Sequence, residues 1–200
     1  LAGAADVGFY YQTPLALEDK DGELAFGLHL SNIGNKLSYS EDQEPEFLPM
    51  NLRLGTRYTL DLDAYNKLSA TIDLNKFLVP TPPVYSQDDP NEIVAGKDDD
   101  ISMPLSLIQS FYDAPGGTKE ELNEIMYSVG MEYLYNDQFA VRAGYFHENE
   151  NKGNRKFFSM GIGLQLNVLG LDFSYLVPTA GRTSPLANTV RFSLIWNFGN

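Results

Sequence analysis

The chain has 200 residues, of which 43% are hydrophobic, which is enough for one domain with a sizeable core. Its formal net charge of −13 excludes a nucleic-acid partner, because phosphate binding requires clustered Lys and Arg. Cysteine is absent, which excludes disulfide scaffolds and thiolate metal sites and fits an exported protein. No run approaches the roughly 20 apolar residues of a membrane-spanning helix, whereas a spanning strand needs only about 9–11.

The start of the chain, Leu1 to Ala5, has no initiator Met and no basic region followed by an apolar stretch. We therefore expect that processing or truncation removed the true N-terminus. From there on, apolar residues alternate with polar ones at the period of a β-strand, which predicts about nine strands. The alternating segments are Val7 to Tyr11, Leu24 to Leu30, Leu52 to Leu60, Leu68 to Leu74, Ser128 to Tyr135, Phe139 to Tyr145, Phe158 to Leu166, Leu169 to Tyr175 and Val190 to Phe198.

In each of these segments one face is apolar and carries no charge. Such a pattern fits two architectures, a soluble β-sandwich and a membrane barrel whose apolar face is outside. Aromatic residues gather near both sets of strand ends, as in the two interfacial girdles of a membrane barrel, so the barrel is favoured. They are Tyr58, Tyr135, Phe139, Trp196 and Phe198 at one end, and Tyr145, Phe158 and Tyr175 at the other.

The opposite face carries charges of both signs, which we predict to line the lumen of the barrel. These residues are Arg53, Arg57, Glu132, Arg142, Asp172 and Arg191. They could line a conduction path, but paired charges also fill and stiffen barrel interiors, and the filling role is favoured.

Connection lengths alternate between short and long, as periplasmic turns and extracellular loops do in outer-membrane barrels. Short links are expected at Asp61 to Asn66, Asn136 to Gln138 and Asn167 to Val168, and the intermediate link Thr13 to Glu23 joins this periplasmic set by parity. Long links are expected at Asn32 to Leu48, Lys76 to Met126, His147 to Arg155 and Pro178 to Leu186. Because the strand count is odd and the first strand runs downward, the chain is read as a fragment of a larger barrel.

The longest of these links, residues 76–126, has an organisation of its own. Two apolar stretches flank an acidic one, and Thr118 with Glu121 matches a capping box that starts a short helix through Met126. Covering the barrel mouth and binding a partner are equally compatible with this loop. For binding, the expected anchors are Val79, Val84 and Tyr85 on one side and Leu105, Ile108 and Phe111 on the other, with Asp98, Asp99 and Asp100 as a solvated separator.

Metal, cofactor and catalytic signals are sparse. The acidic stretch lacks EF-hand spacing, so a solvated loop is favoured over a Ca²⁺ site, and no metal or cofactor is predicted. His29 and His147 are the only imidazoles, and the nearby Ser159 has the opposite parity to His147. A non-enzymatic protein is therefore predicted, with a lipid hydrolase such as a lipid A deacylase as the minor alternative.

Several stretches resemble one known family. They are Ser31 to Ser40 (SNIGNKLSYS), Phe47 to Gly55 (FLPMNLRLG), Asp63 to Leu68 (DAYNKL), Asp73 to Pro83 (DLNKFLVPTPP), Asp113 to Gly117 (DAPGG), Lys152 to Lys156 (KGNRK) and Pro185 to Phe198 (PLANTVRFSLIWNF). Together they resemble the C-terminal half of the PorV family of the type IX protein secretion system, over nearly the whole chain.

The resemblance implies that residues 1–200 are the C-terminal part of one all-β domain, a 14-stranded FadL-type barrel in the bacterial outer membrane. It implies a role beside the large translocon barrel, where cargo proteins are received by their C-terminal signal domains. The cargo is then passed to a sortase-like attachment complex, among outer-membrane lipids and lipopolysaccharide. Trp196 and Phe198 fit the terminal strand used for barrel assembly. A FadL-like transporter of hydrophobic small molecules is the alternative function.

Overall fold

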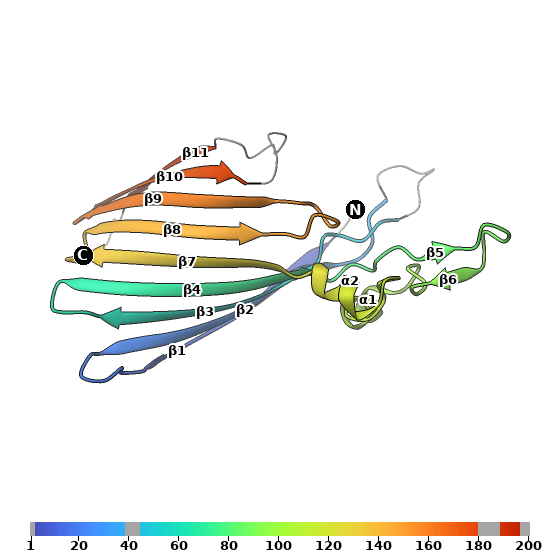
Figure 1. Ribbon diagram of the computed structural model, residues 1–200, viewed down its shortest axis with the longest axis horizontal. Helices are drawn as coiled ribbons and strands as arrows, with labels where there is room; N and C mark the ends of the chain where they lie inside the picture. Colours follow the sequence, from blue (N-terminus) through green and yellow to red (C-terminus); the bar gives the residue numbers. More distant parts are fainter. Residues whose placement is uncertain (1–2, 39–44, 180–188, 197–200) are drawn as a thin grey trace. The chain divides into compact units, whose positions relative to one another are not determined.

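A computed structural model describes residues 3–38, 45–179 and 189–196. These residues form a 9-stranded sheet in which strands lie next to their neighbours in sequence, and β4 lies next to β7 (Figure 1). The strands are β1 (Ala4–Pro14), β2 (Gly22–Gly34), β3 (Asn51–Asp61), β4 (Asn66–Phe77), β7 (Met126–Tyr135), β8 (Phe139–His147), β9 (Lys156–Leu166), β10 (Leu169–Pro178) and β11 (Val190–Trp196). No helix among the described residues is long and apolar enough to cross a membrane.

The predicted all-β class and the alternating connection lengths are confirmed. From β7 to β11 each strand pairs antiparallel with the next one, through turns as short as Asn167 to Val168. In the described part of the chain, however, β1 and β11 remain at the two edges of the sheet. The closed ring and its fourteen strands therefore stay predictions.

Contacts divide the chain into two compact units. The strand unit comprises Tyr10–Phe26, Gly55–Leu74 and Tyr127–Asn200, and the loop unit comprises Leu1–Phe9, Gly27–Leu54 and Asn75–Met126. Each unit is described by itself below.

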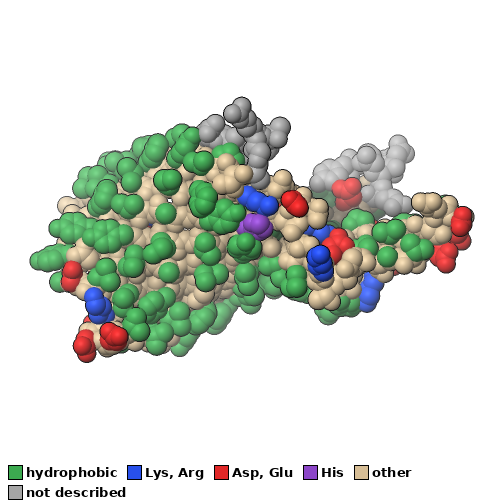
Figure 2. All heavy atoms as spheres, in the orientation of Figure 1, with side chains coloured by type: hydrophobic (Ala, Val, Ile, Leu, Met, Phe, Trp, Pro, Cys, Tyr) green, Lys and Arg blue, Asp and Glu red, His purple; other side chains and the backbone are tan. Residues whose placement is uncertain are grey.

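The strand unit has one face covered with exposed apolar side chains (Figure 2). On β9 alone, Met160 is 60% and Ile162 50% exposed, although both lie in the middle of the strand. Register places Ala143 and Val141 of β8 opposite these two residues, so the apolar face continues from strand to strand. Exposing such a surface to water is costly, and it has the composition of a surface that faces an apolar solvent.

The turn between β7 and β8 shows why these strands form a tight hairpin. Asn136 and Asp137 both have positive φ, at 53° and 52°, and the Gln138 N–H donates to the Tyr135 carbonyl at 3.0 Å. Asn and Asp tolerate this left-handed conformation better than other non-glycine residues, and two such residues make the turn whose twist matches the flanking strands. The turn therefore fixes the register of the two strands.

The loop unit contains two helices and a small hairpin, in addition to the ends of β1 to β4. The helices are α1 (Met103–Gln109) and α2 (Thr118–Asn123), and the hairpin is formed by β5 (Val84–Tyr85) and β6 (Ile93–Ala95). Its buried apolar side chains include Met50, Leu78 and Met126, each at most 3% exposed.

The capping box predicted for α2 is wrong in detail. Gly117 is the N-cap residue, with a φ of 66°, and Thr118 is already helical. Because Gly117 takes this conformation without steric cost, the cap needs no hydroxyl, and Glu121 reaches back to accept from the Ala114 N–H at 2.8 Å. The helix also ends at Asn123 rather than continuing through Met126, since Met126 begins β7.

Candidate partner-binding surface

Helix α1 is inverted, with polar residues inside and apolar residues outside. Ser106 and Gln109 are buried, whereas Leu105 and Ile108 are 45% and 63% exposed. The Ser106 hydroxyl is satisfied locally by the Met103 carbonyl at 2.7 Å, and the Gln109 amide donates to the Asp98 carbonyl at 2.6 Å. A helix that covers its own protein normally buries the apolar side, so this orientation leaves an apolar ridge available to another molecule.

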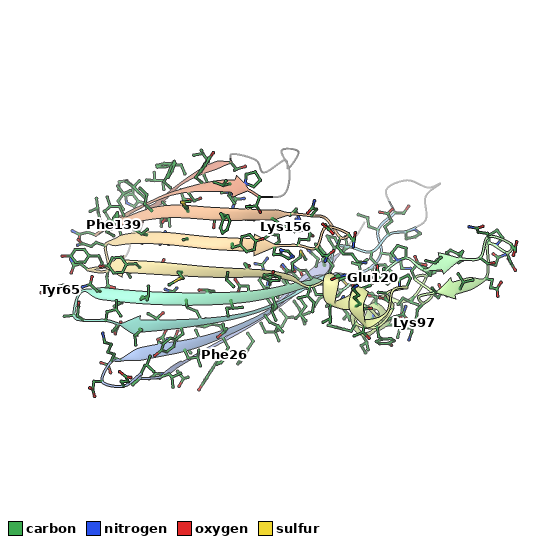
Figure 3. The ribbon with its side chains drawn as sticks, in the orientation of Figure 1. Phe26, Tyr65, Lys97, Glu120, Phe139 and Lys156 are labelled. Carbon is green, nitrogen blue, oxygen red and sulfur yellow. The ribbon has the colours of Figure 1, made fainter. Side chains whose placement is uncertain are left out.

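The three residues predicted as an anchor on and after α1 are exposed as one ridge, and their role in binding stays a prediction. Leu105, Ile108 and Phe111 follow each other at a spacing of three residues, and Phe111 is 49% exposed. Tyr112 extends the ridge and was missed in the sequence, although it directly follows Phe111. Its ring lies under the Lys97 ammonium, 3.8 Å from the centroid, which fixes the ring at the surface. Figure 3 labels Lys97 at this point of the loop.

The second predicted anchor lies on and before β5. Val84 and Tyr85 are 49% and 45% exposed, whereas Val79 is only partly exposed. Gly96 follows β6 with a φ of 87°, and a Cβ there would lie 3.2 Å from the Pro83 Cα. Glycine at position 96 thus allows the backbone after β6 to lie close to Pro83 just before β5, while Val84 and Tyr85 stay exposed.

The acidic separator has a structural part in addition to its solvated one. The Asp98 carboxylate accepts from the Asp100 N–H at 2.9 Å, and Asp98 also receives the Gln109 amide described above. Asp100, whose side chain is 94% exposed, pairs with Lys36 at 2.8 Å. The Lys36 bond keeps the pKa of the Asp100 carboxyl below its usual range. The segment therefore holds α1 in place, which the sequence did not reveal.

A buried charge cluster fixes the same loop to the end of β4. The Lys76 ammonium lies 3.1 Å from Glu121 Oε2 and also bonds Glu124 Oε2, and the three side chains are 6%, 10% and 13% exposed. Thr81 joins it, with its hydroxyl donating to Glu124 at 2.7 Å and its N–H to Asp113 at 3.2 Å. These bonds join residues more than 30 positions apart and were not predicted from the sequence.

Asp113 is the carboxylate of this cluster whose hydrogen bonding is least complete. Its side chain is almost fully buried, and Oδ1 has no hydrogen-bond partner among the described residues. Burial raises the pKa of the Asp113 carboxyl to about 6, and the charges of Glu121 and Glu124 add to this rise against the Thr81 N–H and Lys76. The cluster therefore contains three carboxylates and one ammonium, which bonds Glu121 and Glu124 but not Asp113.

Four of the six residues predicted to line the lumen form a ladder across the polar face of the strand unit. Arg57 bonds Ser69 at 2.9 Å and Glu132 at 2.8 Å, Glu132 bonds Arg142, and Arg142 bonds Asp172. In the described parts of the chain Arg53 and Arg191 make no ion pair. The ladder shows the paired charges that a filling role requires, but lumen lining stays a prediction.

Glycine on β9 allows this ladder to cross from β8 to β10. A Cβ at Gly163 would lie 2.7 Å from Asp172 Oδ1 and 2.8 Å from Arg142 Nη1. Because Gly163 has no side chain, Arg142 of β8 can reach across β9 to Asp172 of β10.

Of the predicted assembly signal, Trp196 lies on β11 opposite Leu169 and is 55% exposed, whereas Phe198 lies outside the described residues. The role of Trp196 and Phe198 in barrel assembly stays a prediction.

The hydrolase alternative gains no support from the geometry. Ser159 pairs with Gly144 on the polar face, whereas His147 follows Tyr145 on the apolar face. A nucleophile and a base on opposite faces of one sheet cannot share a proton.

Comparison with known proteins agrees with the resemblance found in the sequence. Residues 2–84 match the model of the family described as type IX secretion system protein PorV. No curated protein matches the chain. The family match implies a component of the type IX secretion system, and the all-β fold fits an outer-membrane protein.

Proposed function

We propose that the protein is a non-enzymatic outer-membrane barrel of the type IX secretion system that binds the large translocon barrel through the loop at residues 76–126. In this role it receives cargo by the C-terminal signal domain and passes it to the sortase-like attachment complex. The family match to residues 2–84 supports the secretion system, and the chemistry of the loop supports partner binding.

The observation that carries the proposal is the inversion of α1. A passive lid would gain stability by burying Leu105, Ile108 and Phe111 and exposing Ser106 and Gln109, yet the loop does the reverse. The bonds of Lys76 to Glu121 and Glu124 hold the loop in this arrangement. Protein interfaces typically concentrate their affinity in a few such apolar and aromatic anchors.

The exposed apolar face of the strand unit supports the outer-membrane location. Strands can cross lipid only if their backbone groups pair and their outward side chains are apolar, and β7 to β10 meet both conditions apart from His147 and Lys156 at one end of β8 and β9.

The test replaces Leu105, Ile108 and Phe111 with Ser in the full-length protein expressed in its own cells. Co-purification with the translocon and export of cargo are measured, and heat modifiability reports barrel folding. We expect the retained translocon to fall about tenfold or more, because truncating an anchor costs more than about 1 kcal/mol each. Leu122→Ser is the matched control, since Leu122 is 64% exposed on α2 of the same unit.

A coarser test deletes Val84 to Ser110. If translocon binding and export both persist at wild-type level in a folded barrel, the loop is a lid and the binding proposal is wrong. If export fails while the barrel stays folded, a passive pore for small molecules is no longer a sufficient account.

A further inference from the structure

Asp113 is linked to both predicted anchors of the loop surface. Its Oδ2 accepts a hydrogen bond from the Thr81 N–H at 3.2 Å, and Thr81 belongs to the segment 79–85 that carries one anchor. In the sequence, Asp113 comes two positions after Phe111, the last residue of the other anchor. The backbone of Gly96 after β6 also approaches it, since a Cβ there would lie 3.2 Å from the Asp113 carbonyl oxygen. A change in the charge of the Asp113 carboxyl therefore acts on both anchors.

This carboxyl group has no counter-ion of its own. The charged groups that face it are Lys76 from the end of β4, Glu121 from α2 and Glu124 at the C-cap of α2. The Lys76 ammonium bonds the two glutamates, and the side chain of Asp113 is almost fully buried. Three ionised carboxylates beside one ammonium would leave two negative charges where little water remains, which costs free energy. A proton on Asp113 reduces this excess to one charge.

The same ammonium also lies against the exposed ridge. Lys76 Nζ is 5.8 Å from the centroid of the Phe111 ring, within the distance of a cation–π interaction. An ionised Asp113 attracts Nζ in competition with this ring and with the two glutamates, whereas a protonated Asp113 leaves Lys76 with them. The charge of Asp113 is thereby coupled to the Phe111 ring, and through the Thr81 hydrogen bond to the second anchor.

The charge of Asp113 changes in a mildly acidic range. Burial raises the pKa of its carboxyl from the ordinary value of 3.8 to about 6. The folded loop therefore holds the proton more tightly than the open loop does, and the stability that the proton provides is lost as the pH rises through about 6. Helix α1 contains no charged residue, and His29 and His147 both lie outside residues 76–126, so no imidazole of the loop titrates in this range.

We infer that Asp113 is a proton-operated switch of the loop surface: the protonated form holds the two anchors in the binding arrangement, and ionisation of Asp113 loosens them and releases the partner. The inference rests on the proposed function, because it concerns the regulation of the same surface. Asp113 is in this sense a positioning residue, which acts through Lys76 and Thr81.

The test uses the full-length protein bound to the translocon, immobilised and washed in detergent buffer at pH 5, pH 6 and pH 7.5. The amount of translocon retained is measured after each wash. We expect the wild type to lose retention by up to about tenfold between pH 5 and pH 7.5. This is the limit that proton linkage sets for one carboxyl with a pKa of 3.8 in the open loop and about 6 in the folded loop.

Asp113→Asn should remove this dependence and retain as much translocon at pH 7.5 as the wild type does at pH 5. The amide keeps an oxygen for the Thr81 N–H and carries no charge. Asp88→Asn is the matched control, because it removes an exposed carboxylate from the same loop between β5 and β6 and should keep the wild-type profile. If Asp113→Asn keeps the wild-type profile, or retains little translocon at every pH, the inference is overturned.

Hydrogen exchange at Thr81 and Ala114 of the wild type, corrected for its intrinsic pH dependence, reports the loop without any variant. We expect protection at these two amides to fall over the same pH range, and constant protection would overturn the inference. If the wild type retains no translocon at any pH, the proposed function fails and the switch fails with it. If it retains the translocon equally at every pH, only the switch fails.

Discussion

The strand unit and the loop unit both expose apolar side chains, but they differ in how far their networks of ion pairs are buried. In the strand unit the charges form an open ladder, and Arg57, Arg142 and Asp172 keep 48%, 44% and 34% of their side chains exposed. In the loop unit Lys76, Glu121 and Glu124 are almost fully buried. Water still solvates the partly exposed charges of the ladder, whereas Lys76, Glu121 and Glu124 have little contact with water and depend on their ion pairs. Removing one charge should therefore matter far more in the loop.

The largest effect is expected from Lys76→Met. It leaves Glu121 and Glu124 buried without their cation, at a cost of about 3–5 kcal/mol to the loop unit. We expect rapid proteolysis at residues 84–110 while the barrel remains heat-modifiable. Arg57→Met in the ladder is the control and should cost about 1 kcal/mol or less. Similar protease resistance of the two variants would contradict the difference between buried and open charges.

The next effect concerns the apolar face. Leu194→Arg puts a charge on a surface that we assign to lipid, and should lower barrel stability by about 2–4 kcal/mol. Ser193→Arg is the control, because Ser193 is on the polar face opposite Asp172 and gains an acidic neighbour. Unfolding of both variants in lipid vesicles, followed by tryptophan fluorescence, compares the two faces. Equal tolerance would mean that the faces are assigned wrongly.

A pH effect should be confined to the loop. Because the folded-state pKa of Asp113, about 6, lies above its ordinary value of 3.8, the folded loop binds more protons in that window and loses stability as the pH rises through it. The loss is at most about 3 kcal/mol at neutral pH. Asp113→Asn should remove it and slow hydrogen exchange at Thr81 and Ala114 at pH 7, with no difference near pH 4. A pH-independent difference would exclude Asp113 as its source.

The smallest effect is expected from Gly163→Ala. The added Cβ displaces Arg142 and Asp172 from their bond, but both are partly exposed, so the loss should be about 0.5–1 kcal/mol. Chemical denaturation of the folded barrel measures it, with Gly27→Ala as control because nothing lies within 4 Å of a Cβ there. Equal stability of the two variants would show that the bond across β9 contributes nothing.

Alternation with period two was enough to predict the strands of the 9-stranded sheet, but not the short strands β5 and β6 of the loop. The prediction for β8 began at Phe139, as the strand does, and apolar and charged residues are separated along β7 to β10 except at Lys156, the first residue of β9. Side chains of a strand alternate by geometry, so a local pattern reports this part of the fold.

The loop was predicted less well, for physical reasons. The sequence predicts only an apolar stretch at α1, because the helix has seven residues and helical periodicity is recognised over windows of about 11–18. The Lys76 cluster depends on contacts over 45 residues, for which sequence spacing gives no rule. The cap of α2 was misplaced because Gly117 replaced the expected hydroxyl. In contrast, exposure of the two anchors was anticipated from composition alone.

The pairing of β4 with β7 has a consequence for the order of folding. All other neighbours in the sheet follow each other in sequence and can form as hairpins within microseconds, whereas this seam must first close the segment 78–125. Closing such a loop costs roughly 3–4 kcal/mol of chain entropy. The bonds of Lys76 to Glu121 and Glu124 join the two ends of that segment, next to the point where β7 begins. The same ion pairs that hold the loop surface in the folded protein therefore also favour the pairing of β4 with β7 during folding. They join the strands β1 to β4 to the strands β7 to β11.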